Sequence, residues 1–170
     1  GKFGKVLEIR CGFNHCSDMD VNKPINWKRM VKFNGEYGCL GDLGIHTQHV
    51  PFRLGWIPEN VYAKLSKYIT ERPDGKGGMA KCETWDNATL VCDTTDADGN
   101  KFPIYFETKR MQPGATDDWY IEIYGMDMSV KFSTTDPNCF YFTEAIGSEQ
   151  AWARLNVGNK PQFKTATGGI

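Results

Sequence analysis

The chain has 170 residues, of which 40% are hydrophobic and 13% aromatic, and its formal net charge is −1 at pH 7. This composition supports one packed core and excludes a disordered chain. The balanced charge excludes a general nucleic-acid binder, which needs an excess of Lys and Arg to neutralise phosphates. No apolar run reaches the ~18 residues of a membrane-spanning helix, so we expect no membrane partner.

The chain begins with Gly-Lys-Phe rather than Met. We therefore expect a piece of a longer protein, with residues 1–157 as one domain and 158–170 as a polar stretch. The six cysteines form no Cys-x-x-Cys pair. We expect free, mostly buried thiols and a cytoplasmic location, because a domain of this size needs no disulfides and an isolated cysteine packs like a small apolar residue.

The first half of the chain predicts one strand and one helix. Apolar and charged residues interleave over residues 3–13, which predicts a strand, and loop-forming residues follow to position 24. Leu43, Val50 and Leu54 fall on one side of a helix predicted over 41–55. We expect Pro51 to kink this helix and Gly55 to end it.

The second half predicts strands and turns. Alternating or apolar runs occupy residues 61–69, 89–94, 102–108, 119–124, 128–132, 139–142 and 151–157. The glycine-rich segment 73–78 predicts a flexible loop, and the segment 96–100 predicts a hairpin turn. Successive strands with short turns favour an antiparallel sheet, so the fold class expected is α+β with helices on one face.

One side of the predicted helix carries ionisable residues. Asp42, His46, His49 and Arg53 lie within about 60° of each other at helical spacing. A neutral imidazole exchanges protons near pH 7, and a carboxylate one turn away orients it. Three interpretations stay open at this point: a solvated helix face, a catalytic pair, and a zinc site built from Asp42, His46 and His49.

Several common catalytic patterns are absent from the sequence. It contains no Gly-x-Gly-x-x-Gly turn, no P-loop and no Gly-x-Ser-x-Gly nucleophile elbow. The carboxylate pair Asp117-Asp118 has no partner at a spacing that argues for a glycosidase. The helix face therefore remains the strongest indication of chemistry.

An ordered set of short motifs resembles a known family. The chain is similar to the C-terminal domain of the glucose–fructose oxidoreductase, inositol dehydrogenase and MocA family. The matching pieces span residues 1–157 in the same order: the start Gly-Lys-Phe-Gly-Lys-Val-Leu, Asn-Trp-Lys at 26–28, Gly-Asp-Leu-Gly-Ile-His at 41–46, Arg-Leu-Gly at 53–55, Trp-Asp-Asn-Ala at 85–88 and Trp-Tyr-Ile-Glu-Ile-Tyr-Gly at 119–125.

The resemblance implies a two-domain dehydrogenase. In this family an N-terminal Rossmann domain binds NAD or NADP and carries a catalytic Lys in a Glu-Lys-Pro element, which this chain lacks. By the resemblance, His46 is the acid/base on the substrate hydroxyl and Asp42 orients the substrate and His46. Trp27 and Lys28 match a pair facing the substrate, with Lys in place of the common Arg, and His49 is a further substrate-binding candidate.

The resemblance also implies partners and leaves alternatives. The expected substrate is a sugar or cyclitol, and the chain alone is expected to be inactive. The open sheet face is expected to pair copies of the protein into a homo-oligomer. The alternatives are a non-catalytic assembly or carbohydrate-binding relative and an NAD-dependent glycoside hydrolase of the same family.

Overall fold

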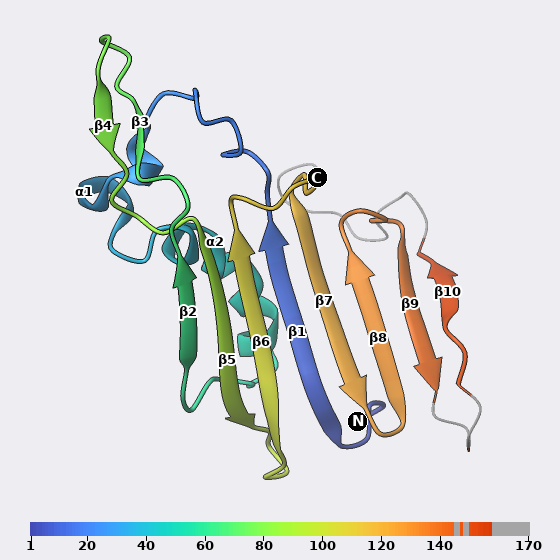
Figure 1. Cartoon of the computed structure of the whole chain (residues 1–170). Helices are drawn as coiled ribbons and strands as arrows, with labels where there is room; N and C mark the ends of the chain where they lie inside the picture. The colour runs from blue at the N-terminus through green and yellow to red at the C-terminus, as the bar shows by residue number, and fades with distance from the viewer. Residues whose placement is uncertain (145–146, 148–149, 158–170) are drawn as a thin grey trace, which may run out of the picture.

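The computed structural model describes residues 1–144, 147 and 150–157, so the predicted polar stretch 158–170 lies outside the described residues. The strands of its main sheet are β1 (Val6–Asn14), β2 (Tyr62–Ser66), β5 (Asn87–Thr95), β6 (Lys101–Lys109), β7 (Asp118–Gly125), β8 (Met128–Ser133), β9 (Cys139–Glu144) and β10 (Ala153–Asn156). They follow the order β10-β9-β8-β7-β1-β6-β5-β2 (Figure 1). Only β1 and β6 pair in parallel within this sheet. The expected α+β class with a largely antiparallel sheet is confirmed.

Helices and a small hairpin lie beside the sheet. They are η1 (Trp27–Arg29), α1 (Val31–Asn34), α2 (Cys39–Arg53) and the hairpin of β3 (Glu71–Pro73) with β4 (Met79–Lys81). Figure 1 shows α2 against one face of the sheet, while the hairpin extends beyond one end. The flexible loop predicted at 73–78 is the turn of this hairpin. Its strands are too short to show an alternating pattern, which is why the sequence missed them.

The core lies between α2 and the central strands. Alternate residues of β1, β5, β6 and β7 face the helix and are buried, while their neighbours face the other way. Phe102, Ile104 and Phe106 are at most 3% exposed, so these positions of β6 belong to the core. Tyr105 takes the opposite face, where it pairs in register with Arg10.

Helix α2 begins two residues before its predicted start and contains Pro51 in its last turn. Gly38 permits the close approach before the helix, because it has φ +58° and a Cβ there would lie 2.6 Å from the backbone nitrogen of Trp85. Leu43 is buried as expected. The placement of Leu54 on the buried side is wrong: the helix ends at Arg53, and Leu54 is 51% exposed.

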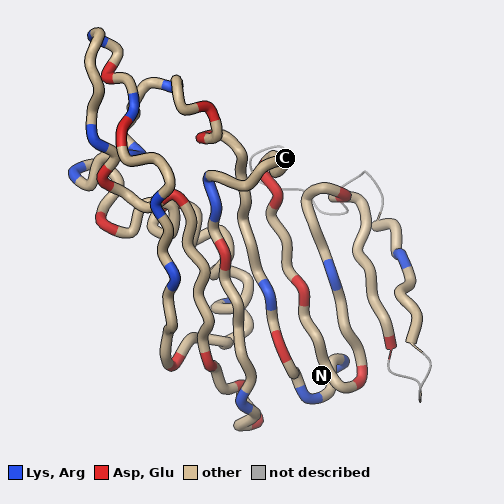
Figure 2. The backbone as a smooth tube through the Cα atoms, viewed as in Figure 1, with Lys and Arg blue, Asp and Glu red and all other residues tan. Residues whose placement is uncertain are grey.

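The described residues leave the face opposite α2 uncovered, and this face carries an unbroken row of paired side chains. Strand registers align one residue from each of the eight strands: Tyr62, Val91, Tyr105, Arg10, Glu122, Lys131, Tyr141 and Arg154. We call these residues the open-face row. Figure 2 shows that acidic and basic positions are intermixed across these strands.

The six cysteines are free thiols, and all but Cys16 are buried. Burial raises the pKa of Cys11 to about 12 and that of Cys39 to about 11, where a hydrogen bond with Thr108 partly opposes it. The expectation of mostly buried thiols is confirmed. In the described part of the chain, no helix is both long and apolar enough to cross a membrane.

Gly12 tests the packing of the open face. A Cβ at this position would lie 2.2 Å from a ring carbon of Tyr120, whose hydroxyl donates to Glu107 at 2.8 Å. We expect Gly12→Ala to lower the free energy of unfolding by about 1–3 kcal/mol through overpacking. Gly41→Ala is the matched control, because its Cβ has no heavy atom nearer than 3.7 Å, and it should be neutral or stabilising. Equal effects of the two variants in urea unfolding would contradict this account.

Candidate functional site

Four polar side chains lie just beyond one edge of the sheet, on the side that faces α2. Asp86 precedes β5, Arg110 follows β6, His15 follows β1 and Asp117 precedes β7. Each continues the alternation of the buried positions of its strand by one step, and the registers of the four strands place them next to one another. The backbone nitrogen of Arg110 donates to the carbonyl of Asp86 at 3.1 Å, which extends the pairing past the strands.

The first turn of α2 places Asp42 against this edge. Its carboxylate forms an ion pair with Arg110, whose side chain is only 3% exposed. Burial lowers the pKa of Arg110 from its ordinary value, and the charge of Asp18 opposes that shift. A carboxylate in the first turn of a helix is also favoured by the helix dipole. The Asp42 carboxylate is therefore fixed at a defined position between the helix and the strand ends.

His46 lies one turn further along α2 and is exposed. Its ring meets that of Phe13 edge to face, with centroids 5.2 Å apart. The indole nitrogen of Trp119 donates to the His46 carbonyl at 2.6 Å. Contacts from β1 and β7 therefore position this turn of the helix while the imidazole stays accessible.

The other predicted site residues lie on η1 and further along α2. Lys28 is half-buried in η1, and burial followed by the charge of Arg110 lowers its pKa. Trp27 is 49% exposed, and the Lys28 ammonium lies 5.6 Å from its ring centroid. His49 is exposed, and its Nδ1 lies 3.1 Å from the His46 carbonyl. Lys28 therefore lies within the electrostatic influence of Arg110. His49 lies about one turn beyond His46 on α2.

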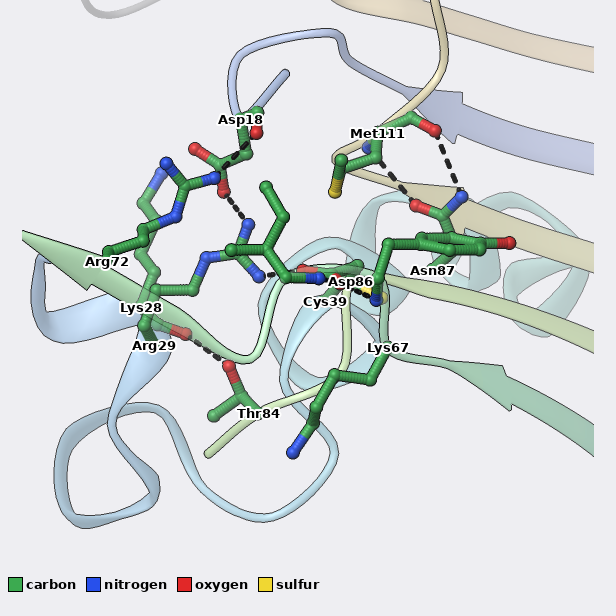
Figure 3. Close-up of polar contacts among 12 residues, drawn as sticks. Asp18, Lys28, Arg29, Cys39, Lys67, Arg72, Thr84, Asp86, Asn87 and Met111 are labelled. Atoms are coloured by element: carbon green, nitrogen blue, oxygen red, sulfur yellow. Dashed lines mark hydrogen bonds and ion pairs between the residues drawn. The ribbon is translucent and has the colours of Figure 1, made fainter. Parts of the chain in front are cut away.

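A buried ion network holds the segment that carries Lys28 (Figure 3). Arg29 is 1% exposed and forms ion pairs with Asp86 and Asp18, the latter at 2.5 Å. Asp86 also accepts from the backbone nitrogen of Ile69 at 3.1 Å. Because two buried carboxylates share one buried guanidinium, the charges are compensated only when all three segments are in place.

Backbone acceptors complete this anchoring (Figure 3). Arg72 is 1% exposed and donates to the carbonyl of Asp18 at 2.6 Å. Thr84 donates to the carbonyl of Lys28 at 2.8 Å. The Asn87 amide both accepts from and donates to the backbone of Met111 at 3.1 Å, which fixes the turn after Arg110.

The described residues contain no group of three or more His, Cys, Asp or Glu arranged to hold a metal ion. Asp42, His46 and His49, the three residues of the zinc alternative, therefore do not form such a group. Asp42 instead turns its carboxylate to Arg110. The chemistry available at this edge is proton exchange by imidazole together with hydrogen bonding by a carboxylate, a guanidinium and an ammonium.

Sequence reasoning missed Arg110 and the part played by His15 and Asp117. His15 falls in the loop-forming stretch after the first predicted strand, and Asp117 enters the sequence analysis only as half of a carboxylate pair. These residues can be found by extending the alternation of buried and exposed side chains one step past the end of each strand. Grouping them at one place also requires the knowledge that β1 and β6 are parallel, since parallel strands have their carboxyl ends at the same edge.

No family model matches the chain. It is 32% identical over 78 residues to levoglucosan dehydrogenase of Pseudarthrobacter phenanthrenivorans, covering 46% of the chain. The structure of an oxidoreductase domain protein from Kribbella flavida covers 92% of the chain with a TM-score of 0.78 and 25% identity. A levoglucosan dehydrogenase complex with NADH and levoglucosan covers 93% with a TM-score of 0.77 and 23% identity.

The resemblance expected from the sequence is confirmed. The chain is similar to the C-terminal domain of the glucose–fructose oxidoreductase, inositol dehydrogenase and MocA family. It spans 20% of the length of the curated relative and 41% of each of the two solved chains. The match to the solved proteins lies in their C-terminal part.

Arg29 gives a direct test of the buried network. Arg29→Met leaves Asp18 and Asp86 buried without their shared cation, and we expect it to lower the free energy of unfolding by about 3–5 kcal/mol. Phe33→Ala, at a side chain that is 60% exposed, should change it by less than about 0.5 kcal/mol. Chemical denaturation of both variants measures the difference. An Arg29→Met variant as stable as Phe33→Ala would show that the network does not hold the site.

The same network predicts acid sensitivity. Burial raises the pKa of Asp18, but the hydrogen bond from Lys23 and the charge of Arg29 outweigh it and leave the pKa below its usual value. A depressed carboxyl pKa contributes stability above the unfolded value of about 3.9, and this stability is lost as pH falls through the folded value. The loss of unfolding free energy between pH 6 and pH 3 should be smaller in Asp18→Asn than in the unmodified chain. An equal loss would remove Asp18 from the explanation.

Proposed function

We propose that the chain forms the substrate side of an NAD(P)-dependent dehydrogenase that oxidises a secondary hydroxyl of a sugar or cyclitol. The observation that supports this proposal most is the position of Asp42 and His46. They lie one turn apart on α2, next to the sheet edge where Arg110 and His15 lie. The similarity to levoglucosan dehydrogenase, an enzyme solved with NADH and levoglucosan, supports this substrate class.

The residues described here do not fit the dinucleotide itself. In these residues no strand leads through a Gly-x-Gly-x-x-Gly turn into a helix, which is the element that holds a pyrophosphate. We infer that NAD or NADP is held by a separate domain and supplies the hydride acceptor. This chain then contributes the groups that bind the polyol and move its proton.

His46 is the proton acceptor in this proposal. Oxidation of a secondary alcohol removes a hydride from carbon and a proton from oxygen, and the proton passes to the His46 imidazole. The accessible ring and the fixed helix turn suit this role. Asp42, held by Arg110, accepts a hydrogen bond from a hydroxyl and so orients the substrate.

Lys28 and the aromatic rings beside it complete the proposed binding surface. The ammonium of Lys28 donates to substrate oxygens as a point charge, in contrast to the bidentate contact of an Arg. Trp27 supplies an exposed ring on which the apolar face of a sugar packs. His49 is proposed to contact substrate only at its margin, because one of its ring nitrogens already meets the His46 carbonyl.

The open-face row supports the proposed homo-oligomer. Lys131 lies 4.3 Å from the ring centroid of Trp152 and 5.6 Å from that of Tyr124, so cations and rings interleave on this face. A self-complementary surface of this kind suits two copies related by a two-fold axis. We propose this face as the contact between subunits.

The proposed function is tested in the full-length protein with NAD+ and NADP+, using levoglucosan, L-sorbose and a cyclitol as substrates. His46→Ala should lower kcat by about 10²-fold or more, because a general base contributes that much. Arg53→Ala, at the end of the same helix, should keep most of the activity. Full turnover by His46→Ala would overturn the role of His46. Release of free sugar from a glycoside without net NADH would favour the glycosidase alternative.

A further inference from the structure

His15 stands out among the groups that the proposed reaction does not use. Its side chain is 15% exposed at the end of β1, and its ring meets Phe13 edge to face with centroids 4.5 Å apart. Phe13 also contacts His46, so one aromatic ring touches both imidazoles. Phe13 therefore connects His15 to the proposed proton acceptor, on the side of the sheet that faces α2.

The two nitrogens of His15 have different surroundings. Nδ1 lies 2.6 Å from a carboxylate oxygen of Asp117, whereas Nε2 is buried without a hydrogen-bond partner. A carboxylate can only accept, so this contact favours the tautomer with hydrogen on Nδ1. The lone pair of Nε2 is then left as an unused acceptor, and a buried acceptor without a partner costs free energy.

The backbone at Asp117 places its carboxylate next to His15. Asp117 has φ +57°, and no other non-glycine residue in the described ranges has a positive φ. The Asp117 carbonyl accepts from Trp119 and Thr134 at 3.0 and 2.9 Å, which holds this conformation. A left-handed backbone at a non-glycine residue is disfavoured, and such positions cluster at functional sites.

Charged groups on three neighbouring elements determine the protonation of His15. Burial lowers its pKa and the charge of Asp117 opposes this, while Arg110, which follows β6, and Lys28 in η1 lower it further. Asp118 at the start of β7 raises it weakly. The net shift is downward, so the ring is neutral at pH 7 and Nε2 accepts rather than donates.

We propose that His15 binds the substrate by accepting a hydrogen bond at Nε2 from a hydroxyl next to the one that is oxidised. This inference rests on the proposed function and requires that the hydroxyl next to the oxidised one is free. Lys28 and Arg110 offer donors, while Asp42 and His15 offer acceptors, so adjacent hydroxyls can each donate and accept. Asp117 is a positioning residue in this arrangement, because it fixes the tautomer of His15.

The tautomer is measured directly by 15N NMR of the imidazole rings. The chain has only three histidines, so the His15→Gln spectrum assigns the His15 signals. We expect hydrogen on Nδ1 and a titration midpoint below the ordinary value of about 6.5. Hydrogen on Nε2 at pH 7, or a midpoint above that value, would overturn the proposal.

The binding role is measured by the kinetics of the full-length enzyme with a vicinal diol. His15→Leu should raise KM about tenfold with little change in kcat, since it removes one hydrogen bond made equally in ground and transition states. His15→Gln should recover part of the affinity, because its amide oxygen reaches a similar position. An unchanged KM in His15→Leu would overturn the proposal.

The Asp117→Gly variant distinguishes a role of Asp117 in orienting His15 from a role in stabilising the fold. Glycine adopts a positive φ freely, so this variant should be at least as stable as the unmodified chain while KM rises. Asp118→Asn is the control with the same loss of charge and should leave KM unchanged. Activity that depends on His46 but not on His15 would reject this inference and keep the proposed function. A full-length protein inactive towards every polyol would reject both.

Discussion

The buried guanidinium of Arg29 is the constraint on which the candidate site depends. It joins Asp18, on the segment after β1, to Asp86, next to Arg110, and it is itself adjacent to Lys28. A buried charge without its partner costs far more free energy than an exposed one. Separating any one of these segments from the others is therefore strongly unfavourable. The site residues gain their fixed positions from this network, although none of its carboxylates faces the proposed substrate.

The parallel pair at the centre of the sheet supplies the second constraint. Parallel strands end at the same edge, so β1 and β6 deliver His15 and Arg110 side by side. The antiparallel neighbours start there and add Asp86 and Asp117. Helix α2 crosses this edge with its first turn, which is why an acidic residue on the helix meets a basic residue from a strand end.

The sequence predicted most of the strands and the long helix, because these elements have strong periodicity. It missed the β3–β4 hairpin and the short helices, whose few residues give no periodic signal. It placed Leu54 on the buried side because helical spacing says nothing about where a helix ends. Asp42 and His46 were found from their spacing on one helix, which is a local property.

The remaining site residues depend on contacts between distant segments. Arg110 follows a strand by one residue and looks in the sequence like any polar turn residue. Its burial follows from the register between β5 and β6, which no local pattern contains. The same is true of His15, because its contact with Asp117 joins residues about a hundred positions apart in the sequence.

A crystal structure of the full-length protein with a bound vicinal diol and its dinucleotide would show where the substrate lies relative to α2 and the strand ends. We expect the diol between the first turns of α2 and the strand ends, with one hydroxyl at His46, its neighbour at His15 and both near Asp42. A diol bound elsewhere, with Asp42 and His46 facing solvent, would contradict it.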